Sequence, residues 1–297
     1  MTNMNSWRLL LFLKLFRKKS KYLLTISRQS STVSLENSLN KKEVKNVNSS
    51  GVCLVRFTCC FSCRFYFLKR KYQFRFALVG LGALGFLVSS QLLERLLHLL
   101  ILQPRMDGSN WLMTSHPYLY ALYGILAAGL FEETARFLIF KYLSARQTLQ
   151  NRDAIGYGLG HGGIELLLLG VLQLLNFLLI SQMIASGQTE GLSQIVIKQM
   201  ESLTPLSIFL PVFERLIALA VQILLSIWVY LAVKKKRVNL YVMAIIWHAL
   251  IDLPAMLYQE KILSNMLLTE LILLGASLLL WFLTKRMIKK EGEKGLI

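Results

Sequence analysis

Two adjacent carboxylates and a guanidinium, Glu132, Glu133 and Arg136, interrupt a long apolar run from Tyr118 to Phe140. A charged side chain at the centre of a membrane-spanning helix costs roughly 2.5–3.5 kcal/mol on insertion scales. Charges kept at that depth therefore indicate pairing or function. Because a buried glutamate can take a proton from water and so start a hydrolysis, this stretch is the first candidate for chemistry.

Two other apolar runs carry a histidine followed four residues later by an acid, namely His161 with Glu165 and His248 with Asp252. Residues four apart share one face of a helix, so we expect each acid to orient or neutralise its histidine. The glycines on either side of His161 leave room for another helix or a substrate backbone to approach.

The three runs bring their polar residues to a similar depth. Glu132 and His161 each lie nine residues from a basic loop residue, and His248 lies eleven residues from one. At 1.5 Å per residue, all three lie roughly 13–16 Å from the same membrane boundary. We therefore expect the three helices to meet in one bundle near the membrane midplane.

Such a set can hydrolyse a bond in two ways. Glu132 can act as a general base with His161, while His248 and Asp252 hold the developing oxyanion. Alternatively, Glu132, His161 and His248 can bind zinc and leave one position open for water. Two other classes stay open from the spacing alone: buried polar residues also hold structural helix bundles together, and transporters place charges at the midplane.

Composition sets the fold class. The chain has 297 residues, of which 55% are hydrophobic and 17% are charged. Its apolar residues come in runs near the ~20 residues that a membrane-crossing helix needs, whereas a membrane β-barrel would show alternating strands. We predict an all-α, polytopic transmembrane helical bundle with about six spans. The expected spans are 74–102, 118–140, 154–184, 205–233, 238–258 and 266–283.

The basic charge is concentrated before these spans. Residues 1–73 hold 15 Lys and Arg against 2 Asp and Glu, out of a net charge of +18 for the whole chain. We predict a basic, poorly structured segment over 1–73 and a transmembrane protease-like domain over 74–290. Beside a membrane, anionic lipid headgroups are the expected partner rather than nucleic acid. One CxxC in this segment is weak evidence for a metal site; its four cysteines are Cys53, Cys59, Cys60 and Cys63.

Loop charges predict the orientation. Alternate connections, at 141–153, 234–237 and 285–294, hold 3, 4 and 5 Lys and Arg, whereas the other three hold one each. The positive-inside rule then places the basic loops and the C terminus in the cytoplasm. Since the candidate layer lies within about three helical turns of these loops, we also expect water to reach it from the cytoplasmic side.

The ordered motifs resemble a known family. The segments Glu132–Arg136, Gly160–Glu165 and His248–Asp252 are similar to those of the YhfC family of bacterial intramembrane proteases. That family looks like a branch of the clan of CAAX-processing and bacteriocin-processing membrane endopeptidases, whose motifs are EExxxR, FxxxH and HxxxN/D. The resemblance covers about residues 70–290.

The resemblance implies an endopeptidase of the bacterial plasma membrane that cleaves a membrane-proximal bond of a peptide or membrane protein. Glu132 would be the base, His161 would help it, and His248 with Asp252 would stabilise the oxyanion. A glutamic mechanism without a cofactor is favoured; a zinc enzyme using Glu132, His161 and His248, or an inactive scaffold or immunity protein, is the alternative. Supporting roles would fall to Glu133, Arg136, Glu165, Glu214 and Arg215.

Two departures from the family pattern are visible. Arg136 follows the glutamate pair one residue sooner than in the wider clan, so Glu132 and Glu133 could exchange roles. Gln222 stands where a further histidine is expected.

Overall fold

The computed structural model describes residue 70 and residues 73–105 and 109–293, and within these residues it contains helices and no strands. The predicted all-α class is confirmed. The predictions for the N-terminal segment, including those for its four cysteines, fall almost wholly outside the described residues.

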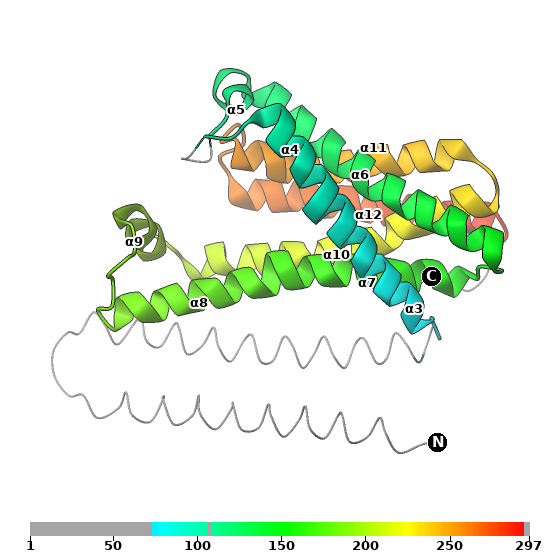
Figure 1. Ribbon diagram of the computed structural model, residues 1–297, viewed down its shortest axis with the longest axis horizontal. Helices are drawn as coiled ribbons and strands as arrows, with labels where there is room; N and C mark the ends of the chain where they lie inside the picture. The colour runs from blue at the N-terminus through cyan, green and yellow to red at the C-terminus, as the bar shows by residue number, and fades with distance from the viewer. Residues whose placement is uncertain (1–69, 71–72, 106–108, 294–297) are drawn as a thin grey trace, which may run out of the picture. The chain divides into compact units, whose positions relative to one another are not determined.

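The helices follow the expected order along the chain (Figure 1). Two of the long helices contain a π-helical stretch, η1 and η2, so that α3, η1 and α4 form one continuous helix, as do α7, η2 and α8. The segments are α3 (Phe76–Phe86), η1 (Leu87–Glu94), α4 (Arg95–Leu102), α5 (Trp111–Ser115), α6 (Pro117–Arg146), α7 (Asn151–Glu165), η2 (Leu166–Val171), α8 (Leu172–Ala185), α9 (Gln194–Glu201), α10 (Pro205–Lys234), α11 (Val238–Gln259) and α12 (Met266–Lys290).

Five of the described helices are long and apolar enough to cross a membrane. The remaining expected span, 118–140, corresponds to α6, which has 30 residues but carries five charged side chains and is not among the five. Large apolar side chains face outward elsewhere; Leu99 and Leu100, for example, are 58% and 74% exposed. Such a surface suits hydrocarbon rather than water. The five candidate spans are Phe76–Leu102, Asn151–Ala185, Leu210–Lys234, Val238–Gln259 and Met266–Lys290.

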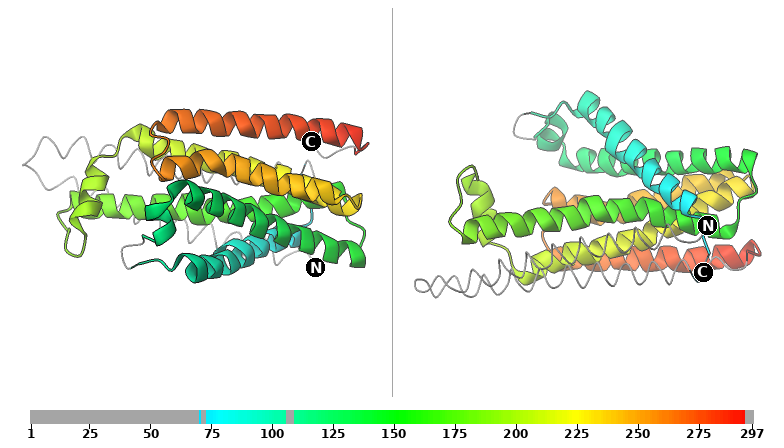
Figure 2. Two further views of the ribbon diagram at one scale, coloured as in Figure 1. Left: turned by 90° about the horizontal axis from the view of Figure 1, so that it is seen from above. Right: turned by 60° about the horizontal axis from the view of Figure 1, so that its bottom comes forward.

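The charged helix α6 lies among the apolar ones. It packs against α3, η1, α10 and α11, and the two views of Figure 2 show it beside α11. Glu133 and Arg136 are 0% exposed and Glu132 is 5% exposed. The bundle therefore shelters these charges, and they have partners within the protein instead of facing lipid.

Backbone contact between α3 and α7 fixes the helix that carries His161. A Cβ added to Gly160 would lie 1.9 Å from the carbonyl oxygen of Val79, and one added to Gly82 would lie 2.1 Å from that of Tyr157. Only glycine permits this approach at those two positions. Gly163 differs, because nothing lies within 4 Å of an added Cβ, so its expected role in close packing is not seen.

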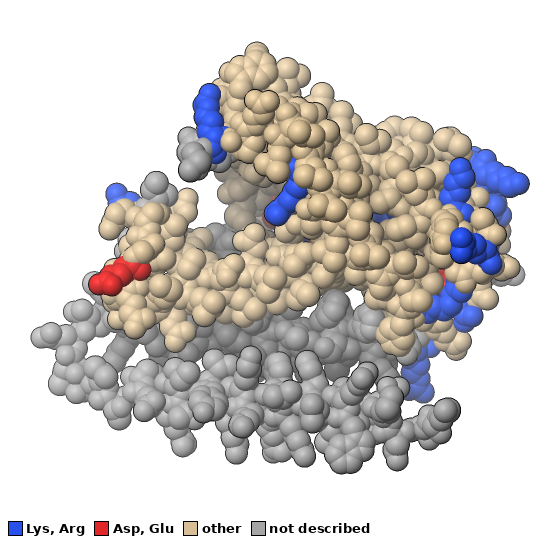
Figure 3. Space-filling model, viewed as in Figure 1, with Lys and Arg blue, Asp and Glu red and all other residues tan. Residues whose placement is uncertain are grey.

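Ion pairs tie together one end of the bundle. Arg75 Nε donates to Asp153 Oδ1 at 2.8 Å, which joins the start of α3 to the start of α7. Lys234 and Lys235 at the end of α10 contact Glu293 at 2.7 and 3.1 Å. Lys and Arg gather at this end, where α12 also ends (Figure 3). The predicted basic loops therefore share one end, which we call the basic end.

Candidate active site

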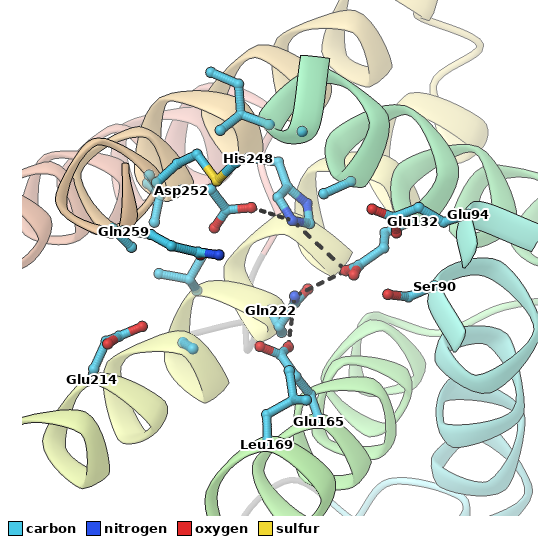
Figure 4. Close-up of a pocket in the computed structure, with 18 of the residues that line it drawn as sticks. Ser90, Glu94, Glu132, Glu165, Leu169, Glu214, Gln222, His248, Asp252 and Gln259 are labelled. Carbon is cyan, nitrogen blue, oxygen red and sulfur yellow. Dashed lines mark hydrogen bonds and ion pairs between the residues drawn. The ribbon is translucent and has the colours of Figure 1, made fainter. Parts of the chain in front are cut away.

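The carboxylate of Glu132 lies where three other helices converge. Its Oε2 atom is 2.8 Å from His161 Nε2 on α7, 3.1 Å from Gln222 Nε2 on α10 and 3.7 Å from His248 Nε2 on α11. Figure 4 shows Gln222 and His248 directed at this oxygen. The expected meeting of the helices that carry Glu132, His161 and His248 is thus observed.

The imidazole of His248 is held on both sides. Its Nδ1 atom lies 2.7 Å from Glu133 Oε1 and its Nε2 atom lies 3.3 Å from Asp252 Oδ2. The predicted pairing of His248 with Asp252 is therefore present. The contact with Glu133 was not expected, and it turns Nε2 toward Glu132 because Nδ1 donates to the other carboxylate.

Arg136 pairs with Glu133 rather than with Glu132, although Glu132 and Arg136 share the i,i+4 spacing. Its Nη1 atom donates to both carboxylate oxygens of Glu133 at 2.7 Å. Its Nη2 atom donates to Gln222 Oε1 at 2.6 Å. Removal of either partner would leave a buried charge without its counterion. The contact therefore holds the side chains of Glu133 and Arg136 in place. Glu132 instead contacts the imidazole rings of His161 and His248.

Gln222 links the groups of the site. Its Nε2 atom donates to Glu132 Oε2 and, at 2.9 Å, to Glu165 Oε2, while its Oε1 atom accepts from Arg136. Sequence reasoning marked this position only as a departure from a family pattern. No spacing signal could have revealed the role, because Gln222 lies 90 residues from Glu132.

Glu165 has partners other than the expected His161. Arg215 Nη1 donates to Glu165 Oε1 at 3.1 Å, and Arg215 Nη2 contacts Glu214. The predicted supporting residues of α7 and α10 thus form one network. The His161 ring packs edge-on against Phe86 at 5.2 Å, and its Nδ1 atom is buried without a hydrogen-bond partner among the described residues.

A cavity of about 380 Å³ reaches this site. Most of its lining lies between the start and the middle of α6 and of α10, over Tyr120–Glu132 and Glu214–Gln222, and between the middle and the end of α11, over His248–Gln259. The lining also includes Glu94 and Asp252. Apart from the site residues near the middle of each helix, such as Glu132, Gln222 and His248, the lined part lies farther from the basic end.

The expectation that water arrives from the basic end is therefore wrong. On that side of Glu132, large side chains fill the interior, among them Phe140, Tyr157, Leu225 and Tyr230, each 0% exposed. The position of a residue along its helix gives its distance from each membrane boundary. It carries no information on side-chain packing, and here packed side chains fill the shorter path to the basic end.

Comparison with known proteins identifies the relationship. A family model described as YhfC intramembrane metalloprotease matches residues 54–273. The chain belongs to the YhfC family. The uncharacterized membrane protein YhfC of Bacillus subtilis (strain 168) is 35% identical over 227 residues, which cover 73% of this chain and 87% of that protein. No solved structure matches the chain. The expected family membership is confirmed, and the protein is a multi-pass membrane protein.

The YhfC description names a metal, so the donor atoms must be compared with those of a zinc site. Glu132, His161 and His248 supply the imidazole and carboxylate types that zinc prefers, and Glu133 holds His248 Nδ1 as outer carboxylates do in such sites. The 2.8 Å contact between His161 and Glu132 is that of a hydrogen bond. Across the described ranges, no three His, Cys, Asp or Glu side chains are spaced to hold a metal ion. The donor types are those of a zinc site, whereas the distances between the donor atoms are those of a hydrogen-bonded network.

Proposed function

We propose that this YhfC-family protein is an intramembrane endopeptidase in which Glu132 activates the attacking water. One observation carries the proposal: the Glu132 carboxylate, bonded by His161 and Gln222, lines a cavity large enough for an extended peptide segment. Transport and scaffolding need no such arrangement of a cavity-lining carboxylate between two imidazoles. The family description supports hydrolysis of a peptide bond.

The chemistry follows from the contacts of Glu132. His161 and Gln222 hold Oε2, so that Oε1 would take the proton of a water molecule as its oxygen attacks the peptide carbonyl. The same carboxyl group would then pass that proton to the departing amine. In this way the carbon–nitrogen bond breaks and the glutamate returns to its starting form.

The oxyanion would be stabilised by His248. With a hydrogen on each nitrogen, this ring would donate from Nδ1 to Glu133 and from Nε2 to the oxyanion in the cavity. Asp252, 3.3 Å from Nε2, would keep the ring in place. Preorganised donors of this kind stabilise the charge that develops in the transition state.

A metal-dependent form of the same reaction is the second candidate, favoured by the family description and by the donor types. Glu132, His161 and His248 would hold the ion. When bound, zinc would acidify a coordinated water and polarise the peptide carbonyl. Glu133 would then serve to orient His248.

One experiment separates these candidates. The purified full-length protein in lipid nanodiscs would be incubated with a fluorogenic peptide library, with and without a chelator, and its zinc content measured. Cleavage that survives chelation in zinc-free protein supports the glutamate-activated water. Cleavage that is lost on chelation and restored by zinc supports the metalloprotease. If no peptide is cleaved under either condition, the hydrolase proposal is wrong and a scaffold role takes its place.

The setting of the reaction follows from the charge distribution. The bacterial relative and the basic end together favour the bacterial plasma membrane, with the C terminus in the cytoplasm. In that orientation the cavity would face the outer half of the membrane. The expected partners are anionic lipids at the basic end and a peptide or membrane-protein substrate at the other; nothing in the described residues suggests a nucleic-acid site.

A further inference from the structure

Glu94 is a buried acid of the cavity that the proposed reaction does not use. It ends the π-helical stretch η1 and is 8% exposed. Its Oε2 atom is buried and has no hydrogen-bond partner within the part of the chain that the structure describes. Its other contacts are His98 Nε2, 3.3 Å from Oε1, and the hydroxyl of Ser90 one turn earlier.

The other cavity acids have strong partners. Glu132 is bonded by His161 and Gln222, and Asp252 pairs with His248. Glu165 and Glu214 share the guanidinium of Arg215, as described above. Each of these acids is therefore matched by an arginine, a histidine or an amide that the active-site network holds in place.

The partners of Glu94 in the described ranges, His98 and Ser90, both lie on its own helix and outside the active-site network. No Lys or Arg in the described ranges forms an ion pair with it. His98 divides its ring between two partners, since its Nδ1 atom lies 2.9 Å from the hydroxyl of Tyr123. A buried carboxylate oxygen without a donor is costly, which makes a donor supplied from the cavity favourable.

The position of Glu94 suits a ligand held next to the reacting bond. Figure 4 shows its carboxylate and Ser90 beside Glu132 in the cavity, and the two acids are close enough to repel each other. Five carboxylates line the cavity, from Glu94, Glu132, Glu165, Glu214 and Asp252, against the guanidinium of Arg215 and the imidazole rings of His98 and His248. Such a wall attracts cations, and stretches of π-helix often occur at functional sites.

We propose that Glu94 binds a cationic group of the substrate, an ammonium or guanidinium, and so selects peptides with a positive charge near the cleaved bond. This inference rests on the proposed peptidase function for its substrate class. The charge could belong to a Lys or Arg side chain or to a free N-terminal amine, because both present N–H donors on a positive group.

Matched peptides test the selection. A peptide that the protein cleaves would be prepared with one lysine moved along its length, with norleucine in place of that lysine, and with a free or acetylated N terminus. We expect kcat/KM to be about 10- to 100-fold higher for the best cationic peptide than for its neutral match, the range expected for a hydrogen bond to a charged group. A lysine-dependent gain assigns the charge to a side chain, and a gain lost on acetylation assigns it to the N terminus.

Variants of Glu94 then decide whether this acid is responsible. Glu94→Gln should bring the ratio of the two kcat/KM values close to one, while Glu94→Asp should keep most of it. Glu190→Gln, at an exposed acid between α8 and α9, is the matched control and should leave the ratio unchanged. A ratio that persists in Glu94→Gln, or a wild-type protein that shows no preference, would overturn the proposal.

A binding measurement separates this inference from the proposed reaction. Fluorescence anisotropy would compare the cationic and neutral peptides on Glu132→Gln protein, with and without Glu94→Gln. If no peptide is cleaved but the cationic peptide still binds more tightly in a Glu94-dependent way, the peptidase proposal fails and the cation site stands. Equal binding of both peptides to the Glu132→Gln protein would end the cation site, whatever the cleavage assays show.

Discussion

Two neighbouring glutamates have different partners in this site. Consecutive residues point about 100° apart around a helix, so Glu132 and Glu133 face different neighbours. Glu133 is enclosed by Arg136 and by His248 Nδ1. Glu132 instead reaches His161 and the cavity. The sequence alone could not decide whether Glu132 or Glu133 is the base, because Arg136 follows the pair one residue sooner than in the wider clan. The structure favours Glu132, since only this glutamate of the two lines the cavity.

Exchange of each carboxylate for its amide should separate catalysis from stability. Glu132→Gln should lower kcat/KM by about 10²–10⁴-fold, as expected for loss of a general base, with little change in Tm. Glu133→Gln should lower the free energy of unfolding by about 3–5 kcal/mol, because it leaves Arg136 buried without its charge partner. Peptide cleavage and thermal unfolding of both variants check this. Full activity in Glu132→Gln, with inactive but stable Glu133→Gln, would exchange the two roles.

Part of the site could be predicted from the sequence. Spacing along one helix predicted the pairing of His248 with Asp252, and depth predicted that Glu132 and His161 would meet. The contacts of Gln222 and of Glu133 with His248 could not be predicted, because they join residues on different helices whose rotation about their axes no single-helix pattern contains.

Among the elements, α3 and α7 depend on backbone contact. Gly160→Ala would place a methyl group 1.9 Å from the carbonyl oxygen of Val79, so the helices must separate. We expect a clear loss of Tm and of cleavage, since His161 follows directly. Gly163→Ala is the matched control in the same helix; with open space around it, it should be neutral or stabilise by up to about 1 kcal/mol. Equal stability of the two variants would contradict this packing.

The position of each helix was predictable where an apolar run ends in polar residues. α11 covers Val238–Gln259 against an expected 238–258. α12 extends to Lys290 rather than ending at 283, because its basic tail continues the helix beyond the apolar run. The π-helical stretches η1 and η2 were not predicted, since their hydrogen-bond pattern leaves no mark on hydrophobic periodicity.

The last described turn is tied to the end of α10 by Glu293, which pairs with Lys234 and Lys235. Partial burial alone would raise the pKa of Glu293, but hydrogen bonds from Lys234, Asn151 and Lys235 lower the pKa from 4.5 to about 2. A lowered folded-state pKa stabilises the fold above pH 4.5, and this contribution is lost as the pH falls toward 2.

Glu293→Gln should therefore lower Tm at pH 6, and its difference from the wild type should shrink between pH 4.5 and 3. Thermal unfolding in detergent at several pH values measures this. Glu190→Gln, at an exposed acid, should show no such pattern. A difference in Tm that stays constant across this range would mean that the ion pairs of Glu293 do not stabilise the folded end.

At the scale of the whole molecule, charge and cavity lie at opposite ends. The Lys and Arg side chains gather at the basic end (Figure 3), while most of the cavity lining lies from the middle of the helices toward their other ends. Positive loops fix a membrane protein by retention on the cytoplasmic side. The two facts together predict a site that water and substrate reach from the outer face.

Thiol labelling tests that prediction. In a background whose four native cysteines are replaced by serine, Ala128→Cys and Ala255→Cys would line the cavity, and Ala232→Cys would lie in the closed core at the basic end. Arg146→Cys and Glu190→Cys, both exposed, mark the two faces. A charged, impermeant thiol reagent added to intact cells should label the two cavity positions together with Glu190→Cys, because water fills that route. Arg146→Cys should react only in inverted vesicles. Ala232→Cys should remain unlabelled from both sides. Cavity positions that react only in inverted vesicles, together with Arg146→Cys, would place the opening at the basic end and restore a cytoplasmic substrate.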